Sequence, residues 1–159
     1  MRHILTALVA VLVVCGCSSN REVATWLGEE DQIREAVFRY QFEFNVSGLG
    51  QAANAYFLSV EGNKDPSAQL LKRFDGHRPP VKPVSASMLE PGTAQVLDRE
   101  SGLPGLIFGI AEIRWLSEDE VEADGGYEEA SESGTGNTYR VVKEAGRWEV
   151  VGCQMLWIK

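Results

Sequence analysis

The chain has 159 residues and a formal net charge of −8, because twenty-three Asp and Glu outnumber fifteen Lys and Arg. Its length fits one domain with a single hydrophobic core. The acidic surplus repels nucleic-acid phosphates and anionic lipid headgroups, so we expect no nucleic-acid partner.

The first sixteen residues have the pattern of an export signal. Arg2 supplies positive charge, the run from Ile4 to Val14 is apolar except for Thr6, and Gly16 is the small residue expected before a cleavage point. This apolar run is too short to cross a bilayer as a helix, which takes roughly twenty residues. An ordinary secretory signal and a buried core helix are the alternatives. An ordinary signal does not need a cysteine directly after the cut, and a core helix would show polar positions at helical spacing.

The segment Val14-Cys15-Gly16-Cys17 resembles the lipobox of bacterial lipoprotein precursors. The resemblance implies that residues 1–16 are removed, that Cys17 receives a diacylglycerol unit, and that the new N-terminus is acylated, for example with palmitate. It places the protein in the cell envelope, attached to the membrane through lipid. Because Ser18 follows the cysteine, the resemblance implies the periplasmic face of the outer membrane in a Gram-negative cell. Two or three acyl chains would anchor stably, whereas a single chain is marginal.

Removal of this leader would limit the chemistry of the mature domain. Cys15 and His3 would leave with the leader and lipid would occupy Cys17, so Cys153 and His77 would be the remaining cysteine and histidine. An intrachain disulfide and a zinc site of several Cys and His ligands are then excluded. We expect no metal and no cofactor, and we expect Cys153 to be a small buried hydrophobe.

Residues 17–28 are predicted to be the lipidated cysteine and a short polar tether, and residues 29–159 one α+β domain. Helical spacing begins at Glu30 and continues to Asn45, and Gly48 is expected to terminate the helix in a left-handed conformation. We expect this helix to pack on a sheet with one side and on a further element with another. Its apolar positions are Ile33, Ala36, Val37, Tyr40 and Phe44.

The middle of the chain is predicted to alternate short strands and one short helix. Residues Ala55 to Val60 are rich in strand-forming side chains. A second helix is expected from Asp65, as its cap, to about Phe74, with Pro66 in the first turn. A loop follows over residues 75–80, and Val81 to Met88 are predicted to form an edge strand because they include Pro83.

The last third of the chain is predicted to be an antiparallel meander of four strands, over residues 106–116, 121–130, 138–143 and 148–158. Residues 132–137 are expected to be a turn, and Gly109 to belong to a turn that leads into the first of these strands. The pair Gly125-Gly126 indicates a bulge or a close backbone approach. The final strand is apolar on both faces, which predicts an internal position in the sheet.

The segment from Tyr139 to Val151 resembles the closing hairpin of NTF2-like (cystatin-like) domains, because a strand ends in a charged turn with Gly146 and Arg147 before Trp148. The resemblance implies an N-terminal helix and a second short helix packed on a curved antiparallel sheet. The mature chain is also similar to small bacterial lipoproteins of unknown activity.

Enzymes of the NTF2-like class hold an acid or base inside a conical pocket, with a hydrogen-bond donor nearby. The candidate catalytic residues implied here are Asp75, His77 and Glu112, with Tyr40 or Tyr56 as the donor. The plainer interpretation is that His77 is an exposed loop residue and that Glu112 forms a surface ion pair with Arg114.

Charge is unevenly distributed along the domain. Between Glu112 and Glu132 there are nine acidic residues and a single arginine, whereas residues 72–82 are basic. This pattern is typical of a solvated sheet face, and alternatively of a docking patch for a basic partner or a divalent cation. We favour a non-catalytic binding or accessory module that takes another protein or a small apolar ligand. The alternative hypothesis is an NTF2-like hydrolase or isomerase that uses a pocket carboxylate or His77.

Overall fold

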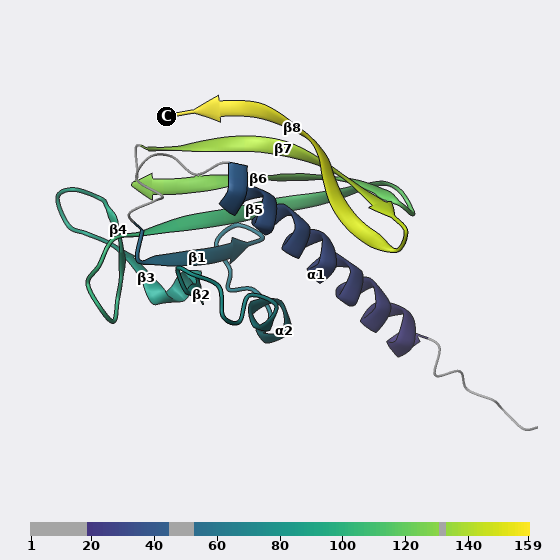
Figure 1. The fold of residues 1–159 in the computed structure, drawn as a ribbon, viewed down its shortest axis with the longest axis horizontal. Coiled ribbons are helices and arrows are strands. Elements are labelled where there is room, and N and C mark those ends of the chain that lie inside the picture. The colour runs from purple at the N-terminus through teal and green to yellow at the C-terminus, as the bar shows by residue number, and fades with distance from the viewer. Residues whose placement is uncertain (1–18, 45–52, 131–132) are drawn as a thin grey trace, which may run out of the picture.

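The computed structural model describes residues 19–44, 53–130 and 133–159, and the predictions for Cys17 and Gly48 lie outside these residues. One long helix runs obliquely across one face of a curved sheet, and the β7–β8 hairpin curls toward it (Figure 1). The elements are α1 (Ser19–Phe44), β1 (Ala55–Val60), α2 (Ala68–Lys72), β2 (Val81–Pro83), the 3₁₀ turn η2 (Val84–Ala86), β3 (Ser87–Leu89), β4 (Val96–Asp98), β5 (Gly105–Ser117), β6 (Glu120–Ala130), β7 (Ser133–Glu144) and β8 (Arg147–Ile158).

The main sheet has six strands in the order β2-β1-β5-β6-β7-β8, and β3 and β4 form a separate two-stranded sheet. The predicted α+β class and the antiparallel meander of β5 to β8 are confirmed. The sequence did not predict that β1 is parallel to both β2 and β5. Parallel neighbours need a long crossover connection, and residues 61–104 provide it between β1 and β5.

The main sheet has two faces, called the helix face and the open face. The helix face packs against α1 and includes Phe108, Val121 and Tyr139, which are all buried. The open face is turned away from α1, and over β1 and β5 it is covered by the β3–β4 sheet, where Val96 packs near Phe57.

Helix α1 begins earlier than predicted, because the segment expected to be a tether is helical from Ser19. The segment contains no proline, which would break a helix, so the helix can extend back to Ser19. The buried stripe also differs from the prediction: Ile33, Val37 and Gln41 are fully buried, whereas Phe44 is 62% exposed. Steps of four residues along the helix carry this stripe, and a polar side chain occupies its last position.

Helix α2 is shorter than predicted and its cap is a different residue. The Oγ of Ser67 accepts a hydrogen bond from the Leu70 amide at 2.9 Å, so Ser67 is the N-cap. The carboxylate of Asp65 instead accepts a hydrogen bond from the amide of Ser85 at 2.8 Å. Asp65 therefore connects the start of this helical segment to η2 rather than capping α2.

The predictions for the final hairpin are corrected in two respects. Residues 133–137, expected to be a turn, belong to β7, which begins at Ser133. Strand β8 lies at the edge of the sheet rather than inside it, and Cys153 is exposed rather than buried. An apolar composition on both faces does not reveal whether a second neighbouring strand exists, so the pattern was consistent with both positions.

The close backbone approach predicted at Gly125-Gly126 is confirmed. A Cβ atom at Gly125 would collide with the carbonyl oxygen of Gly109, and one at Gly126 would collide with the carbonyl oxygen of Thr135. The register irregularity lies on the facing strand β5, between Ile110 and Glu112. Strand β6 therefore keeps an even pairing with β7 through both glycines.

Candidate functional site

The fold places the predicted catalytic residues on different faces. His77 lies in the loop after α2, where its Nδ1 is 2.7 Å from the carbonyl oxygen of Pro79 and its ring stands 5.0 Å from that of Phe42 on α1. Glu112 lies on the open face, on the other side of the sheet. Asp75 is exposed in the same loop as His77. The structure therefore does not bring Glu112 and His77 together.

The two tyrosines proposed as donors belong to the aromatic packing of the helix face. Tyr56 is buried, and its ring contacts the rings of Phe42 and Phe108 at 4.9 Å. Burial raises the pKa of Tyr56. Tyr40 packs edge-to-face on Tyr139 with a centroid distance of 5.8 Å. Side chains fill the space on this face in which a conical pocket was expected.

The acidic residues of the open face are held by one arginine. Arg114 donates to Asp124 at 2.5 and 3.0 Å, to Glu112 at 3.1 Å and to Glu122 at 3.3 Å. Asp124 also accepts a hydrogen bond from Thr138 at 2.6 Å, and the bonds from Arg114 lower its pKa. No group of three or more His, Cys, Asp or Glu side chains within the described residues is arranged to hold a metal ion. Arg114 therefore holds the three carboxylates together, but it does not neutralise all of their negative charge.

A row of glycines crosses the centre of the open face. In the register of the sheet, Ser59 on β1 stands beside Gly109 on β5, which pairs with Gly126 on β6, then with Gly136 on β7 and finally with Trp157 on β8. Three neighbouring strands thus present no side chain at the same level. The missing side chains leave a groove whose floor is polypeptide backbone.

The groove has a volume of about 790 Å³, which lies within the range of small-molecule pockets, about 300–1,000 Å³. A Cβ atom at Gly109 would meet nothing within 4 Å, so the floor is open there. A Cβ atom at Gly136 would collide with the indole of Trp157, so that ring lies directly on the glycine. The remaining apolar lining includes Ile107, Val84, Met88, Leu89, Ala111 and Leu156.

The charges that line the groove are mostly negative. Asp65, Asp124 and Glu128 face a single cation, Arg99, whose Nε donates to the carbonyl oxygen of Ser85 at 3.0 Å. Asp124 is already paired with arginine outside the lining, as described above. Glu128 is likewise paired with Lys159, which lies outside the lining, at 3.4 Å. The two charges that remain, Asp65 and Arg99, offset each other, so the groove suits a neutral ligand.

A buried polar network supports the groove floor from the helix face. The Nε2 of Gln41 donates to the carbonyl oxygen of Gly109 and to the Oη of Tyr139, both at 3.3 Å. Asn137 donates to the same Oη at 3.2 Å. Burial raises the pKa of Tyr139 to about 12. The network connects α1, β5 and β7 at the level of the glycines, so the backbone there is fixed without side chains on the other face.

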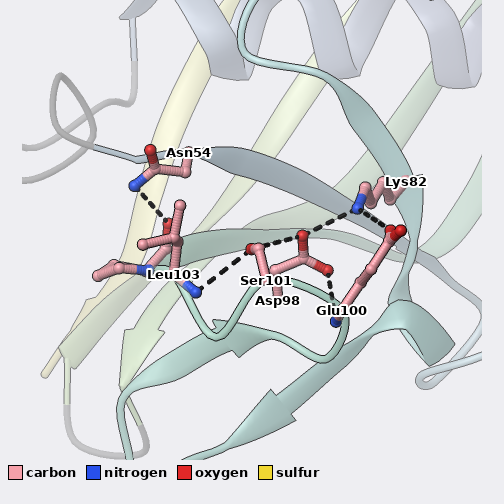
Figure 2. Close-up of polar contacts among 7 residues, drawn as sticks. Asn54, Lys82, Asp98, Glu100, Ser101 and Leu103 are labelled. Atoms are coloured by element: carbon pink, nitrogen blue, oxygen red, sulfur yellow. Dashed lines mark hydrogen bonds and ion pairs between the residues drawn. The ribbon is translucent and has the colours of Figure 1, made fainter.

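An ion pair at one end of the sheet attaches β2 to the β3–β4 unit that borders the groove (Figure 2). The Nζ of Lys82 donates to Asp98 at 2.8 Å and to Glu100 at 3.3 Å, and Ser101 donates to Asp98 at 3.0 Å. The hydrogen bond from Lys82 lowers the pKa of Asp98, and that of Lys82 is raised by the same bond. This ion pair is structural, because the Lys82 ammonium and the Asp98 carboxylate neutralise each other.

Sequence reasoning missed the groove. It assigned Gly109 and Gly136 to turns and the pair Gly125-Gly126 to a bulge or a close backbone approach, and it did not consider Gln41. The signal available for Gln41 was its place four residues after Val37 and eight after Ile33 on the helix. The glycines lie far apart in the chain, and the pairing of strands alone aligns them.

No family model, curated protein or solved structure matches this chain. Among the described residues, no helix has the length and apolar character needed to cross a membrane.

Proposed function

We propose that the protein is a lipid-anchored envelope module that binds a small, flat, neutral and largely apolar molecule in the glycine-floored groove. The observation that supports this most strongly is the alignment of Gly109, Gly126 and Gly136 beside the indole of Trp157. Attachment through Cys17 rests on the lipobox resemblance. The helix packed on a curved sheet supports an NTF2-like domain that carries its ligand site on the open face.

The groove suits a flat ligand for two physical reasons. A backbone floor at Gly109 and Gly126 allows a ring to approach within contact distance of β5 and β6, beside the Trp157 indole that covers Gly136, and a larger side chain at either position would prevent this approach. At one end, Trp157 offers an aromatic edge and face, and such contacts contribute about 0.5–1.5 kcal/mol beyond buried area. Serine hydroxyls at the other end, on Ser59 and Ser85, supply polar groups that would orient the ligand.

Filling the groove from its floor tests the proposal. In Gly109→Ile the new side chain enters open space, and a branched residue favours a strand, so the fold should be retained while ligand volume is lost. The matched control is Gly152→Ile on β8, which lies outside the lining and whose Cβ would be 3.6 Å from that of Arg140.

The measurement is fluorescence titration with Nile red, a neutral and flat apolar probe. We expect the wild-type chain and Gly152→Ile to bind it, and Gly109→Ile to bind at least tenfold more weakly. Equal binding by all three chains would refute the groove as the site. If Gly109→Ile binds the probe more weakly, mass spectrometry of the native protein purified from envelopes should show a bound small molecule in the wild type and none in Gly109→Ile.

The anchor is tested separately with Cys17→Ala. We expect loss of acyl labelling, loss of globomycin-sensitive processing and release of the protein from membranes. Unaltered membrane retention of this variant would contradict the anchor and would leave the groove proposal standing on its own evidence.

A further inference from the structure

We propose that the protein forms a symmetric dimer in which β8 pairs antiparallel with β8 of a second copy, joining the two sheets into one. This goes beyond ligand binding and concerns the edge of β8, although Leu156 and Trp157 of that strand also line the groove.

Strand β8 is a long edge with an apolar surface. It pairs with β7 on one side, and none of the described strands pairs with its other side. Residues 150–158 carry no charged side chain. Trp148, near the start of the strand, is buried, but five apolar side chains further along it are exposed: Val151 52%, Met155 59%, Leu156 54%, Trp157 45% and Ile158 70%. A long, uncharged edge of this kind is a template for pairing with another strand.

The charged residues at the two ends of β8 favour one register for a two-fold pair of β8 strands. If the symmetry axis passes through Gln154, then Glu149 of one copy stands opposite Lys159 of the other, and Val150 stands opposite Ile158. If the axis passes through Cys153 instead, Arg147 stands opposite Lys159, and directly opposed like charges destabilise a sheet. The charges that flank the apolar run therefore favour the axis at Gln154.

The irregularities of β8 are compatible with this axis. Its pairing with β7 shifts at Val151 and again at Leu156, and the segment between them, residues 152–155, is regular. Bulges bend an edge strand and limit how far a partner can pair. Pairing would therefore concentrate on the regular segment, next to the proposed axis.

The opposite edge explains why the assembly should close as a dimer. Strand β2 has three residues, among them Pro83, which lacks a donor, and Lys82, which is held by Asp98. Short edges with proline and lysine resist strand addition. Head-to-tail growth from β8 to β2 is thus disfavoured, and the self-complementary contact between two β8 strands is closed by its two-fold symmetry.

The first test places a charge in the interface. The full-length chain in detergent is analysed by sedimentation, together with Met155→Lys and the control Leu116→Lys, which puts the same charge on an exposed side chain of β5. We expect dimers for the wild type and the control and monomers for Met155→Lys, with the same far-UV circular dichroism spectrum for all three because each keeps its fold. Met155→Lys should lose only the concentration-dependent stability that association supplies. A monomeric wild type, or a dimeric Met155→Lys, would overturn the proposal.

The second test examines the register. In a Cys153→Ser background, Gln154→Cys would meet its own symmetry mate, and opposed strand residues are about 4.5–5.5 Å apart between Cα atoms, close enough for a disulfide. Gly152→Cys, with the same remaining cysteines, would face Leu156 and should not crosslink. Crosslinking by Gly152→Cys without crosslinking by Gln154→Cys would reject this arrangement of strands.

Discussion

Replacing Asp98 with Asn tests the ion pair that attaches β2 to the β3–β4 unit. The Asp98 side chain is 7% exposed, and it accepts from Lys82 at 2.8 Å and from Ser101 at 3.0 Å. Hydrogen bonds to charged groups contribute about 1.5–3 kcal/mol each, but Lys82 is 26% exposed and keeps Glu100 as a partner. We therefore expect Asp98→Asn to lower the free energy of unfolding by about 2 kcal/mol at pH 7. This corresponds to a decrease in Tm of about 4–8 °C.

The pH dependence separates charge from packing. The pKa of Asp98 is lower in the folded chain than in the unfolded one, so its contribution is complete above the unfolded value, about 3.9, and is lost as pH falls through the folded value. Urea unfolding followed by tryptophan fluorescence should show the difference between wild type and Asp98→Asn at pH 7, and a smaller difference well below pH ~4.

Glu100→Gln is the matched control for this substitution. It removes the other carboxylate partner of Lys82, but the Glu100 side chain is 86% exposed. Exposed pairs contribute about 0–1 kcal/mol, so this variant should unfold almost as the wild type does. The reasoning is refuted if Glu100→Gln costs as much as Asp98→Asn, or if the cost of Asp98→Asn is unchanged in acid.

Three further predictions concern the sheet. Tyr139→Phe removes a hydroxyl whose pKa is about 12, so urea unfolding should show that the wild type loses stability between pH 10 and 12 and that the variant loses less, because only the unfolded tyrosine ionises in that window. At neutral pH the variant should be about 1–2 kcal/mol less stable, since two buried amides lose an acceptor. Gly126→Ala places a Cβ against a backbone carbonyl of β7, and we expect a loss of more than about 2 kcal/mol, measured by urea unfolding; a neutral result would show that the strands can separate there. Arg114→Gln leaves the carboxylates around Asp124 uncompensated, and because the Arg114 side chain is 36% exposed, the loss should be about 1 kcal/mol at low salt and smaller in 1 M NaCl. A loss that does not respond to salt would point to packing instead.

The elements of the domain were largely predictable because local signals agree with them. Alternating apolar residues predicted β5, β6 and β8. The hairpin predicted before Trp148 is confirmed, because β7 ends at Glu144 and β8 begins at Arg147. The predicted strand boundaries were wrong where residues that favour turns lie inside a paired strand. Ser133 to Asn137 contain the small polar residues that favour turns, yet strand pairing with β6 extends through them.

The candidate site was less predictable, because it depends on residues that are meaningful only together. His77 and Glu112 carry the chemistry that a sequence search looks for, and the fold separates them. Gly109, Gly126 and Gly136 carry no side-chain chemistry, and the fold aligns them. Their common function arises from register, which is a property of the paired strands.

The amino-acid sequence by itself determined the acidic surface, the lipobox resemblance, and the class of elements, because composition, short motifs and hydrophobic periodicity act within a few residues of each other. Only the tertiary structure decided that β8 is an edge, that β1 runs parallel to β5, and that three distant glycines form one floor. Strand order and register are set by contacts between segments tens of residues apart, and those contacts leave no local pattern in the chain.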